Sequence, residues 1–435
     1  MIIVNAFAIL FAAIAFAACA GILLFIIGKV LFLRLHLSLR QQGLAGEQAR
    51  LAYRLPADAE LPHVVVQLPV YNEGEIVKRA IHAAAALDWP ADKLHIQVCD
   101  DSTDGTTRLA EEAINALAAS DIDIRIVRRA GRDGFKAGSL RKAMECVAYE
   151  YFAIFDADYL PPRDFLRRAM PALLSDARCA FVQARAEFLN RDENALTRIQ
   201  ALELDAHYAV EQATRSWAGL PLPFNGTCGI WRRAAIEAGG GWQGKTLAED
   251  MELSYAAWLK GWRGIFITAL AVPGELPAGR KEWASQQDRW LTGSAQVIRG
   301  FLPAIWQDQR LAGVKRMVAL SNIAMWWLSA LINTTYIATA FAVLLKPALA
   351  PVLLPIVAAI LLVLVILQFI ELRLGDLLLH GHSRRLSAFA ADFAAYLACT
   401  VYKLWLHLFS LAKAFFGKKP EFVRTPKRGI GEHGL

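Results

Sequence analysis

The apolar positions of the chain form long uninterrupted runs toward both ends and short runs between polar stretches in the middle. Residues 1–28 carry no charged side chain, and a helix of about 20 such residues crosses the hydrocarbon core of a bilayer. Two further charge-free runs, Val318–Leu345 and Pro347–Ile370, are separated by a single lysine. This pattern predicts an N-terminal transmembrane helix in residues 1–33 and a transmembrane hairpin in residues 317–371.

Basic residues give these segments an orientation. Lys29, Arg34 and Arg40 follow the first run, and lysine and arginine beside a membrane span stay on the cytosolic side. A cleaved signal peptide would instead carry its basic residues before a shorter apolar run. We therefore expect the chain to be cytosolic from residue 29 onward and to return to the cytosol after the hairpin.

A third C-terminal apolar segment, residues 386–416, has two possible placements. It is interrupted by ionisable residues, namely Asp392, Lys403, His407 and Lys413. Such interruptions suit a helix that lies at the headgroup level. A single crossing would also carry the basic tail, residues 417–435, to the outer side against the positive-inside rule. We predict an interfacial or re-entrant helix with a cytosolic tail, and a full span is the alternative.

The middle of the chain, residues 60–280, has the pattern of a cytosolic α/β domain. Short β-branched runs alternate with helical stretches such as Ile76–Leu87, which is typical of a mostly parallel, Rossmann-like sheet covered by helices. The predicted strands are Val64–Leu68, His95–Cys99, Ile122–Val127, Tyr151–Phe155 and Ala180–Gln183. Ligands of such sheets bind beyond the carboxyl ends of the strands, so chemistry is expected in the residues that follow each strand.

Composition and charge agree with a protein that is partly embedded in a membrane. The chain is 56% hydrophobic and 20% charged, and its mean hydropathy is positive. The net charge is +7, but the basic residues gather beside apolar runs, where membrane lipids are the usual partner, so no nucleic acid is expected. The six cysteines lack Cys-x-x-Cys spacing, which indicates neither a zinc site nor a disulfide framework and fits a reduced compartment.

Acidic residues recur directly after three of the predicted strands. They are Glu73 after the first strand, Asp100 and Asp101 after the second, and Asp156 and Asp158 after the fourth. Carboxylates gathered at one sheet edge need a cation or hydrogen-bond donors such as nucleobase N–H and ribose O–H groups. A nucleoside diphosphate with Mg²⁺ or Mn²⁺ supplies both, and Asp156 and Asp158 are the predicted metal ligands. An isolated Asp-x-Asp would be interpreted as a solvated turn, so the prediction of a metal site depends on the acidic residues after all three strands taken together.

Seven motifs in a fixed order resemble the family 2 glycosyltransferases, which have the GT-A fold, and within them the cellulose synthase-like branch. The motifs are Gln67 to Glu73, Asp100-Asp101-Ser102, Lys136-Ala137-Gly138, Asp156-Ala157-Asp158, Phe224-Asn225-Gly226-Thr227, Glu249-Asp250 and Gln286 to Trp290. The resemblance covers about half of the chain. The stretches Val66–Glu73 and Phe224–Trp231 are most similar to mannan and xyloglucan-backbone synthase-like enzymes and their bacterial relatives.

The resemblance implies roles for individual residues. Those around the nucleobase and ribose would be Tyr71, Glu73, Asp100 and Asp101, with Lys136 near the donor and Asp156 and Asp158 at the diphosphate and metal. Asp250, beside Glu249, corresponds to the general base that deprotonates the acceptor hydroxyl, and a single displacement inverts the anomeric carbon. The alternative is that both acids only favour the N-terminus of the following helix.

Further motifs are implied to bind the acceptor and the end of the donor. Residues 281–316 are expected to form interfacial amphipathic helices that carry the QxxRW motif. In it, Gln286 and Arg289 would bind the donor, and the indole of Trp290 would lie on a sugar ring of the acceptor. Asn225, Gly226 and Thr227 are also expected at the acceptor.

The basic tail partly resembles a gating-loop pattern, FxVTxK. Phe422, Thr425 and Lys427 are in register, but Arg424 stands where the pattern has valine. The resemblance implies that Thr425 and Lys427 bind the donor from a cytosolic tail. The alternative is a basic tail held by anionic lipid.

The expected function is that of an inverting hexosyltransferase in the bacterial inner membrane or an equivalent membrane, with a cytosolic catalytic domain. It would transfer a hexose from a UDP-glucose or GDP-mannose type of nucleotide-sugar donor to a growing β-glycan. The alternative is transfer of one or a few sugars to a lipid or lipid-linked acceptor, which makes a glycolipid. Because the predicted spans are few, translocation of a polymer would need an additional subunit or an oligomer.

Overall fold

The computed structural model describes residues 2–382 and 384–416, so the predicted donor residues Thr425 and Lys427 lie outside the described residues. The chain divides into two compact units. The helical unit comprises residues 2–38, Leu202–Val210 and 286–416, and the sheet unit comprises residues 39–201 and 211–285. Each unit is described by itself.

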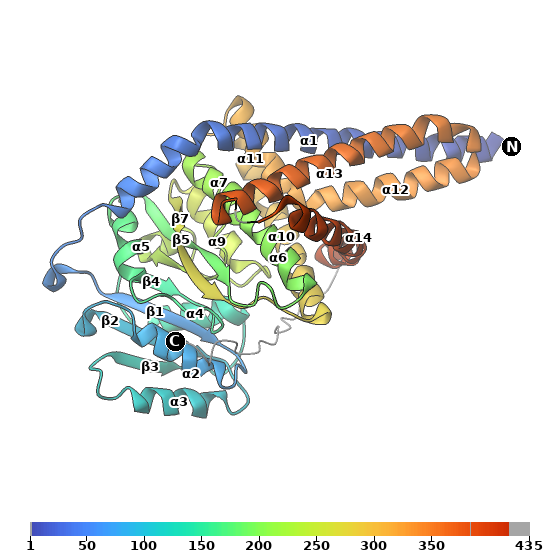
Figure 1. Ribbon diagram of the computed structural model, residues 1–435. Coiled ribbons are helices and arrows are strands. Elements are labelled where there is room, and N and C mark those ends of the chain that lie inside the picture. Colours follow the sequence, from blue (N-terminus) through green and yellow to red (C-terminus); the bar gives the residue numbers. More distant parts are fainter. Residues whose placement is uncertain (1, 383, 417–435) are drawn as a thin grey trace. The chain divides into compact units, whose positions relative to one another are not determined.

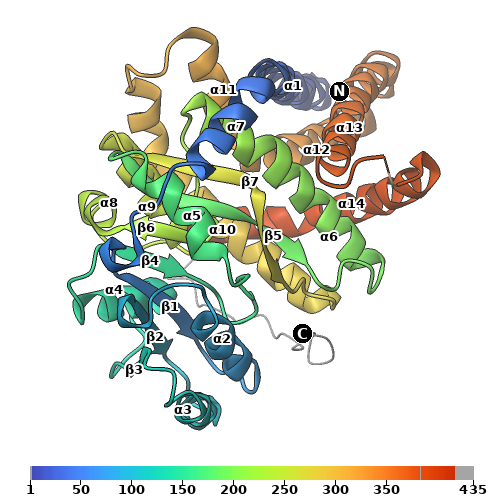
Figure 2. The same cartoon turned by 60° about the vertical axis from the view of Figure 1, so that its left-hand side comes forward.

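The sheet unit is built on a mixed sheet of seven strands within the described residues, in the order β3-β2-β1-β4-β6-β5-β7 (Figure 2). The strands are β1 Val64–Val70, β2 Leu94–Asp100, β3 Asp123–Val127, β4 Tyr151–Ile154, β5 Cys179–Phe188, β6 Gly229–Arg232 and β7 Arg263–Gly274. Strand β6 runs antiparallel to β4 and β5, and the other pairs are parallel. The carboxyl ends of all strands except β6 therefore lie at one edge.

Helices cover the sheet and occupy the connections between its strands (Figure 1). Their bounds are α2 Ile76–Ala85, α3 Thr106–Ala116, α4 Phe135–Glu145, α5 Phe165–Leu174, α6 Ala195–Ala206, α7 Ala213–Ala218, α8 Arg233–Ala238 and α9 Glu249–Leu259. A π-helical turn, His207–Gln212, joins α6 to α7. Such turns occur frequently at functional sites.

Alternation along β1 decides which helix covers which face. Val64, Val66 and Leu68 share one hydrophobic core with α2, as period-two alternation requires. On the opposite face the buried Gln67 donates from Nε2 to Gln97 Oε1 at 3.0 Å and to the Leu140 carbonyl of α4 at 3.3 Å. These buried hydrogen bonds hold α4 in register over β1 and β2, and so position the start of α4.

The fold class agrees with the prediction, and all five predicted strands are present. Strands β6 and β7 were missed. Gly229–Arg232 has only four residues and follows a motif interpreted as an acceptor site, and Arg263–Gly274 begins with an exposed arginine.

The helical unit contains the long apolar helices. The helices of this unit include the first part of α1 Ile2–Leu51, most of α10 Arg280–Gln307, then α11 Gly313–Ile323, α12 Leu328–Leu345, α13 Ala350–His380 and α14 Leu386–Phe416. A 3₁₀ turn, Ala324–Trp327, separates α11 from α12. Within the described residues, four helices are long and apolar enough to cross a membrane: α1, α12, α14 and the helix that contains α13.

Helices α1, α12 and α13 lie side by side (Figure 1; Figure 2). Cys19, Ile22 and Ile26 of α1 pack against Val357 and Ile360 of α13. Large apolar side chains point outward along the same helices, among them Ile3, Ile9, Leu24, Leu344 and Leu362. An apolar exterior around an apolar interior is what a lipid environment requires.

Helix α14 turns its polar side chains inward and its apolar side chains outward. Lys403 binds Glu203 at 2.6 Å, and the carbonyl of Leu404 accepts from Asn333 at 2.9 Å. One turn apart, Val401, Trp405 and Phe409 are exposed. Asp392, Lys403 and Lys413 thus have partners within the helical unit, whereas neither ring nitrogen of the buried His407 has one among the described residues.

The C-terminal part of α1 is anchored in the sheet unit by Glu47. Its Oε1 accepts from the indole Nε1 of Trp217 at 2.7 Å, and its Oε2 accepts from the backbone N and the hydroxyl of Thr268 at 2.9 and 2.7 Å. Gly43 lies against the same indole, because a Cβ there would be 2.3 Å from Trp217 Cδ2. This part of α1 is thus bound as a rigid element of the domain.

Glu47→Leu should lower the free energy of unfolding by about 2–4 kcal/mol, because three donors would lose their acceptor in a buried place. Thermal unfolding of the detergent-purified protein measures the loss. The neighbouring exposed Gln48 provides the control, and Gln48→Leu should change stability by less than about 0.5 kcal/mol. Equal stability of the two variants would contradict the anchoring of α1.

Candidate functional site

The loops after β1 and β2 are joined by hydrogen bonds at the carboxyl edge of the sheet. Asn72, with a positive φ of 57°, donates from its backbone N to Ser102 Oγ at 2.9 Å and accepts at Oδ1 from Thr103 N at 2.8 Å. These bonds hold Tyr71 and Glu73, on either side of Asn72, next to the end of β2. The structure thus brings together the first two predicted acidic motifs.

Asp100 and Asp101 are both bound by arginines of the loop after β3. Asp100 Oδ2 accepts from Arg128 at 2.8 Å and its Oδ1 from Ser102 N at 2.8 Å. Asp101 accepts two bonds from Arg129, at 2.8 and 2.5 Å, a bidentate geometry that fixes both groups. Their first function is therefore to hold the loop that leads into α4.

The Lys-Ala-Gly motif at the start of α4 has a structural explanation for its glycine. A Cβ on Gly138 would lie 2.2 Å from Arg129 Nη1 and 2.0 Å from the Asp133 carbonyl. Glycine at this position leaves room for the Arg129 guanidinium, which binds Asp101 and the carbonyls of Asp133 and Phe135. The motif thus connects the β2 edge to the first turn of α4.

Lys136 of the same motif connects three parts of the site. Its Nζ donates to Asp156 Oδ1 and, at 2.8 Å, to the carbonyl of Gly226. Burial lowers the pKa of Lys136, but the charges of Asp156, Glu249 and Asp250 outweigh this effect, and its pKa lies above the ordinary value. Lys136 therefore remains a cation among carboxylates.

Two buried glutamines hold the Asn225 to Cys228 loop. Gln183 of β5 accepts at Oε1 from the backbone N of Asn225 at 3.0 Å and donates to the Thr227 carbonyl at 2.9 Å. Gln212 donates to Asn225 Oδ1 at 2.8 Å. Thr227 Oγ1 in turn accepts from the backbone N of Asp156 at 2.9 Å. The predicted acceptor residues are thus bound to the predicted metal ligand.

Glu249 and Asp250 begin α9 beside this loop. A Cβ on Gly226 would lie 2.9 Å from Asp250 Oδ2 and 3.6 Å from Lys136 Nζ, so the glycine leaves the carboxylate room. Burial raises the pKa of both acids, the Asp250 charge adds to this for Glu249, and Lys136 opposes it. Asp250 Oδ1 accepts from Met251 N at 2.7 Å, and no side chain caps the helix at Ala248.

The carboxylates after β4 fit a divalent ion that arrives with a nucleotide. No cluster of three or more metal-binding side chains exists in the part of the chain that the structure describes. Asp158 is buried and Asp156 is partly exposed, and the ammonium of Lys136 lies against Asp156 as a cation. Mg²⁺ is typically held by one or two carboxylates and completed by substrate phosphates, so this pair of oxygen donors is sufficient.

The QxxRW residues belong to the helical unit. Gln286, Arg289 and Trp290 lie on α10, with the indole partly exposed. Between them, Asp288 accepts from Ser410 and, at 3.0 Å, from Lys413 of α14. These three residues thus lie in the helical unit, and the other described residues predicted for the site lie in the sheet unit.

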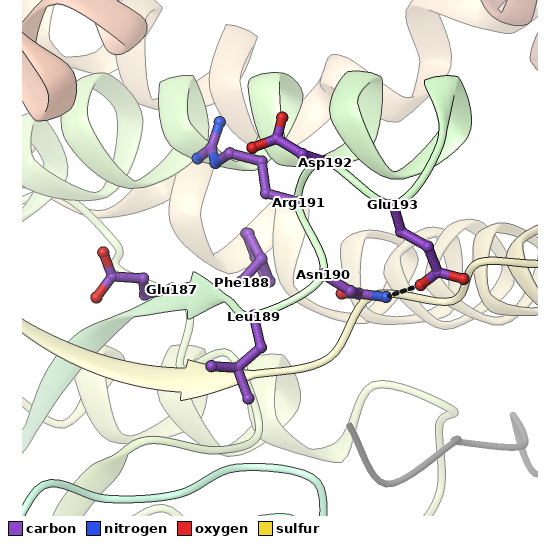
Figure 3. A pocket seen from close by; sticks show the side chains of 7 residues that line it. All are labelled: Glu187, Phe188, Leu189, Asn190, Arg191, Asp192 and Glu193. Carbon is purple, nitrogen blue, oxygen red and sulfur yellow. Dashed lines mark hydrogen bonds between the residues drawn. The ribbon is translucent and has the colours of Figure 1, made fainter. Parts of the chain in front are cut away.

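A hollow of about 560 Å³ lies at the carboxyl end of β5, lined by Glu187 to Glu193 (Figure 3). The side chain of Asn190 holds this segment in place, because it donates to Glu193 Oε2 at 3.1 Å and to the Leu276 carbonyl at 2.9 Å. None of the residues predicted for the site lines it. It shares the sheet edge with them.

Comparison with known proteins agrees with this geometry. A family model described as "Glycosyltransferase like family 2" matches residues 62–293, more than half of the chain. The chain belongs to glycosyltransferase family 2. All seven strands of the described sheet and the acidic loops that follow them lie within the matched residues.

Similar curated family members are plant enzymes. The chain is 41% identical over 266 residues to "Glucomannan 4-beta-mannosyltransferase 2" of Arabidopsis thaliana, a match that covers 60% of this chain and 50% of the relative. It is 44% identical over 245 residues to "Probable glucomannan 4-beta-mannosyltransferase 2" of Oryza sativa subsp. japonica, covering 55% and 42%. The chain thus spans about half the length of the curated relatives that it matches.

A solved structure of a mannosyltransferase matches nearly the whole chain. It is the mannosyltransferase PcManGT from Pyrobaculum calidifontis, in complex with GDP-Man and Mn²⁺, with a TM-score of 0.54 and 21% identity. The match covers 92% of this chain and 99% of that one. Together with the family match it confirms the predicted GT-A-like fold.

The residues that sequence reasoning missed are basic or neutral side chains that support this family 2 site. Arg128 and Arg129 directly follow the third predicted strand, so the rule that identified the acidic loops also applied to them. Gln183 and Gln212 are buried amides, and a buried amide needs hydrogen-bond partners. A polar residue inside an apolar strand was the available signal for Gln183.

Gly138→Ala should displace the Arg129 guanidinium and weaken nucleotide binding by about tenfold or more, with a loss of stability of about 1–3 kcal/mol from the clash. Gly131→Ala is the matched control, since a Cβ there meets nothing within 4 Å. Titration of a nucleoside diphosphate and thermal unfolding test both variants. If Gly138→Ala binds and melts like Gly131→Ala, the explanation of the motif is wrong.

Proposed function

We propose that this chain is a membrane-bound inverting glycosyltransferase that transfers mannose from GDP-mannose to a growing β-glycan. The observation that carries the proposal is the convergence around Lys136. Its ammonium binds Asp156 and the Gly226 carbonyl, and Asp250 lies against the same glycine. A base, an acceptor loop and a carboxylate for the donor therefore meet at one place.

The relatives support the choice of sugar and product. The curated plant relatives are named glucomannan 4-beta-mannosyltransferases, and the neighbour that shares the fold was solved with GDP-Man and Mn²⁺. A mannosyl donor with a guanosine diphosphate leaving group is therefore proposed in preference to UDP-glucose. The names of the curated relatives also support a polymeric product. The transfer assay below distinguishes this product from transfer to a lipid acceptor.

The proposed mechanism is a single displacement. Asp250 accepts the proton of the acceptor hydroxyl, while the hydroxyl oxygen bonds to the anomeric carbon on the face opposite the diphosphate. The bond between that carbon and the diphosphate oxygen breaks, and GDP leaves with the electron pair. Burial raises the pKa of Asp250 and makes it a stronger base than an exposed carboxylate, and Lys136 opposes this effect so that the group can still ionise.

The other residues of the site position the two substrates. Asp156 and Asp158 would hold Mn²⁺ or Mg²⁺, an ion that supplies positive charge to the diphosphate when it is bound. Asn225 to Thr227 would bind the acceptor next to Asp250, and Tyr71 and Glu73 would lie beside the nucleoside. Gln286, Arg289 and Trp290 keep their proposed roles at the donor and the acceptor.

The contacts of α14 favour an interfacial helix with a cytosolic C-terminus. Lys403 binds Glu203 at the end of α6, and Lys413 binds Asp288 of α10. These lysines are ten residues apart, about 15 Å along a helix, yet both contact elements that adjoin the catalytic domain in sequence. If α14 crossed the bilayer, one of these two lysines would lie about 15 Å deeper in the membrane than the other. We therefore propose that α14 lies along the cytosolic face, as the apolar side of Val401, Trp405 and Phe409 also allows.

Purified wild-type protein should incorporate radiolabelled mannose from GDP-mannose with Mn²⁺ into a product that gel filtration resolves as a polymer. Asp250→Asn should lower kcat by about 10²- to 10⁴-fold because the base is lost, and should leave the dissociation constant of GDP nearly unchanged. Since the folded state raises the pKa of Asp250, the ionised group costs stability above its unfolded pKa. The variant should therefore melt at the same or a higher temperature at pH 7.

Glu145→Gln, in the exposed last turn of α4, is the control for removing a surface carboxylate and should keep full activity. Full activity of Asp250→Asn would show that Asp250 is not the catalytic base and only stabilises the N-terminus of α9. A labelled product that extracts into organic solvent as a short glycolipid would show that the acceptor is a lipid and that the enzyme does not make a polymer. Absence of transfer from any nucleotide sugar would contradict the proposal.

The topology is tested with single cysteines labelled by a membrane-impermeant maleimide, after the exposed Cys146 is replaced by serine. Position 382 precedes α14 and position 412 lies near its C-terminal end, and both should react only in opened membranes if the helix does not cross. Position 348, in the turn between α12 and α13, should react in intact cells and is the positive control. Labelling of position 412 in intact cells would show that α14 spans the bilayer.

A further inference from the structure

Three arginines occupy the loop between β3 and α4, and only one of them lacks a polar partner in the described structure. Arg128 binds Asp100 and the Ser102 carbonyl, and Arg129 binds Asp101 and two carbonyls. The Arg132 side chain makes no hydrogen bond or ion pair with residues 2–382 or 384–416, and its Nε is shielded from solvent without a partner there. A desolvated guanidinium donor costs free energy unless something accepts its hydrogen bond.

Aromatic rings hold the Arg132 guanidinium in a defined orientation. Its Cζ lies 3.3 Å from the centroid of the Tyr71 ring and 5.7 Å from that of Phe135. At 3.3 Å the planar group must lie flat on the Tyr71 face, the arrangement that arginine adopts on aromatic rings. Its N–H groups then point sideways, in the plane of the guanidinium, where a planar partner can accept two of them.

The position of Arg132 in the sheet places it on the nucleoside side of the site. Tyr71 follows β1 and Arg132 follows β3, whereas Asp156 follows β4 on the other side of β1 in the strand order β3-β2-β1-β4. With the diphosphate at Asp156, the nucleoside extends across the ends of β1 and β2 toward Arg132. Lys136 is already the cation beside Asp156.

We propose that Arg132 binds the N7 and O6 atoms of a guanine base and thereby selects GDP-linked over UDP-linked donors. Guanine presents these two acceptors side by side on one edge, and arginine pairs with them in a bidentate manner. A pyrimidine with a keto group offers a single acceptor, O4, on the corresponding edge. The proposal rests on the proposed function, because it names the residue that reads the base of the donor at the same site.

The experiment measures the dissociation constants of GDP, UDP and inorganic pyrophosphate, each with Mn²⁺, for the full chain in detergent. Wild-type protein should bind GDP more tightly than UDP. Arg132→Ala should weaken GDP binding by about ten- to a hundredfold, the value of a bidentate contact to a base, and should change UDP and pyrophosphate binding by less than about threefold. Arg132→Lys should recover only part of the loss, because a single ammonium cannot pair with both acceptors.

Arg125→Ala is the matched control, since Arg125 is an exposed arginine on β3 whose guanidinium binds Asp123. It should leave all three constants unchanged. Equal weakening of GDP, UDP and pyrophosphate in Arg132→Ala would show a phosphate contact and overturn the proposal, and so would unchanged GDP binding. Thermal unfolding identifies a variant that fails to fold, in which case Arg132→Lys decides. If the wild-type protein transfers sugar but prefers UDP-linked donors, only the proposal that Arg132 selects guanine is wrong. If the wild-type protein binds no nucleotide, the proposed function is wrong.

Discussion

The ionic contact between Lys136 and the carboxylates around it is the constraint on which the candidate site depends. Asp156 and the adjacent pair Glu249 and Asp250 come from different parts of the chain, and bringing like charges together at a partly buried sheet edge costs free energy unless a cation lies between them. Lys136 supplies that cation and also binds the Gly226 carbonyl. Because α4 is held on β1 and β2 by the buried Gln67 and Gln97, the position of the ammonium follows from the core of the sheet.

The same principle applies to the loops that surround this centre. Arg128 and Arg129 neutralise Asp100 and Asp101, and they fix the loop that carries Arg132. Glycines are required wherever this packing leaves no space for a Cβ, as at Gly138 and Gly226. The residues of the candidate site are therefore held in a rigid frame of charge pairs. In the helical unit, paired polar groups likewise accompany an apolar exterior, since α14 satisfies Lys403 and Lys413 internally.

Much of the fold followed from local patterns. Five strands and the acidic loops that follow them could be predicted, because period-two alternation and a change in polarity at each strand end are local properties. Strands β6 and β7 were missed, because β6 has only four residues and β7 begins with an exposed arginine, so their starts carry no clear local signal. Supporting side chains such as Arg129, Gln183 and Gln212 escaped notice for a different reason: their importance lies in contacts with other segments, and no residue type marks such contacts in advance.

The sequence by itself determined the division into membrane and α/β segments, the order of the motifs and the residue types available for chemistry, since these depend on apolar run length, periodicity and the functional groups present. Only the tertiary structure decided which of those groups meet. It placed Lys136 between Asp156 and Gly226, bound both Asp100 and Asp101 to arginines, and left Arg132 flat on Tyr71. The physical reason is that a charge acts through distance and burial, and both are set by the packing of helices and strands.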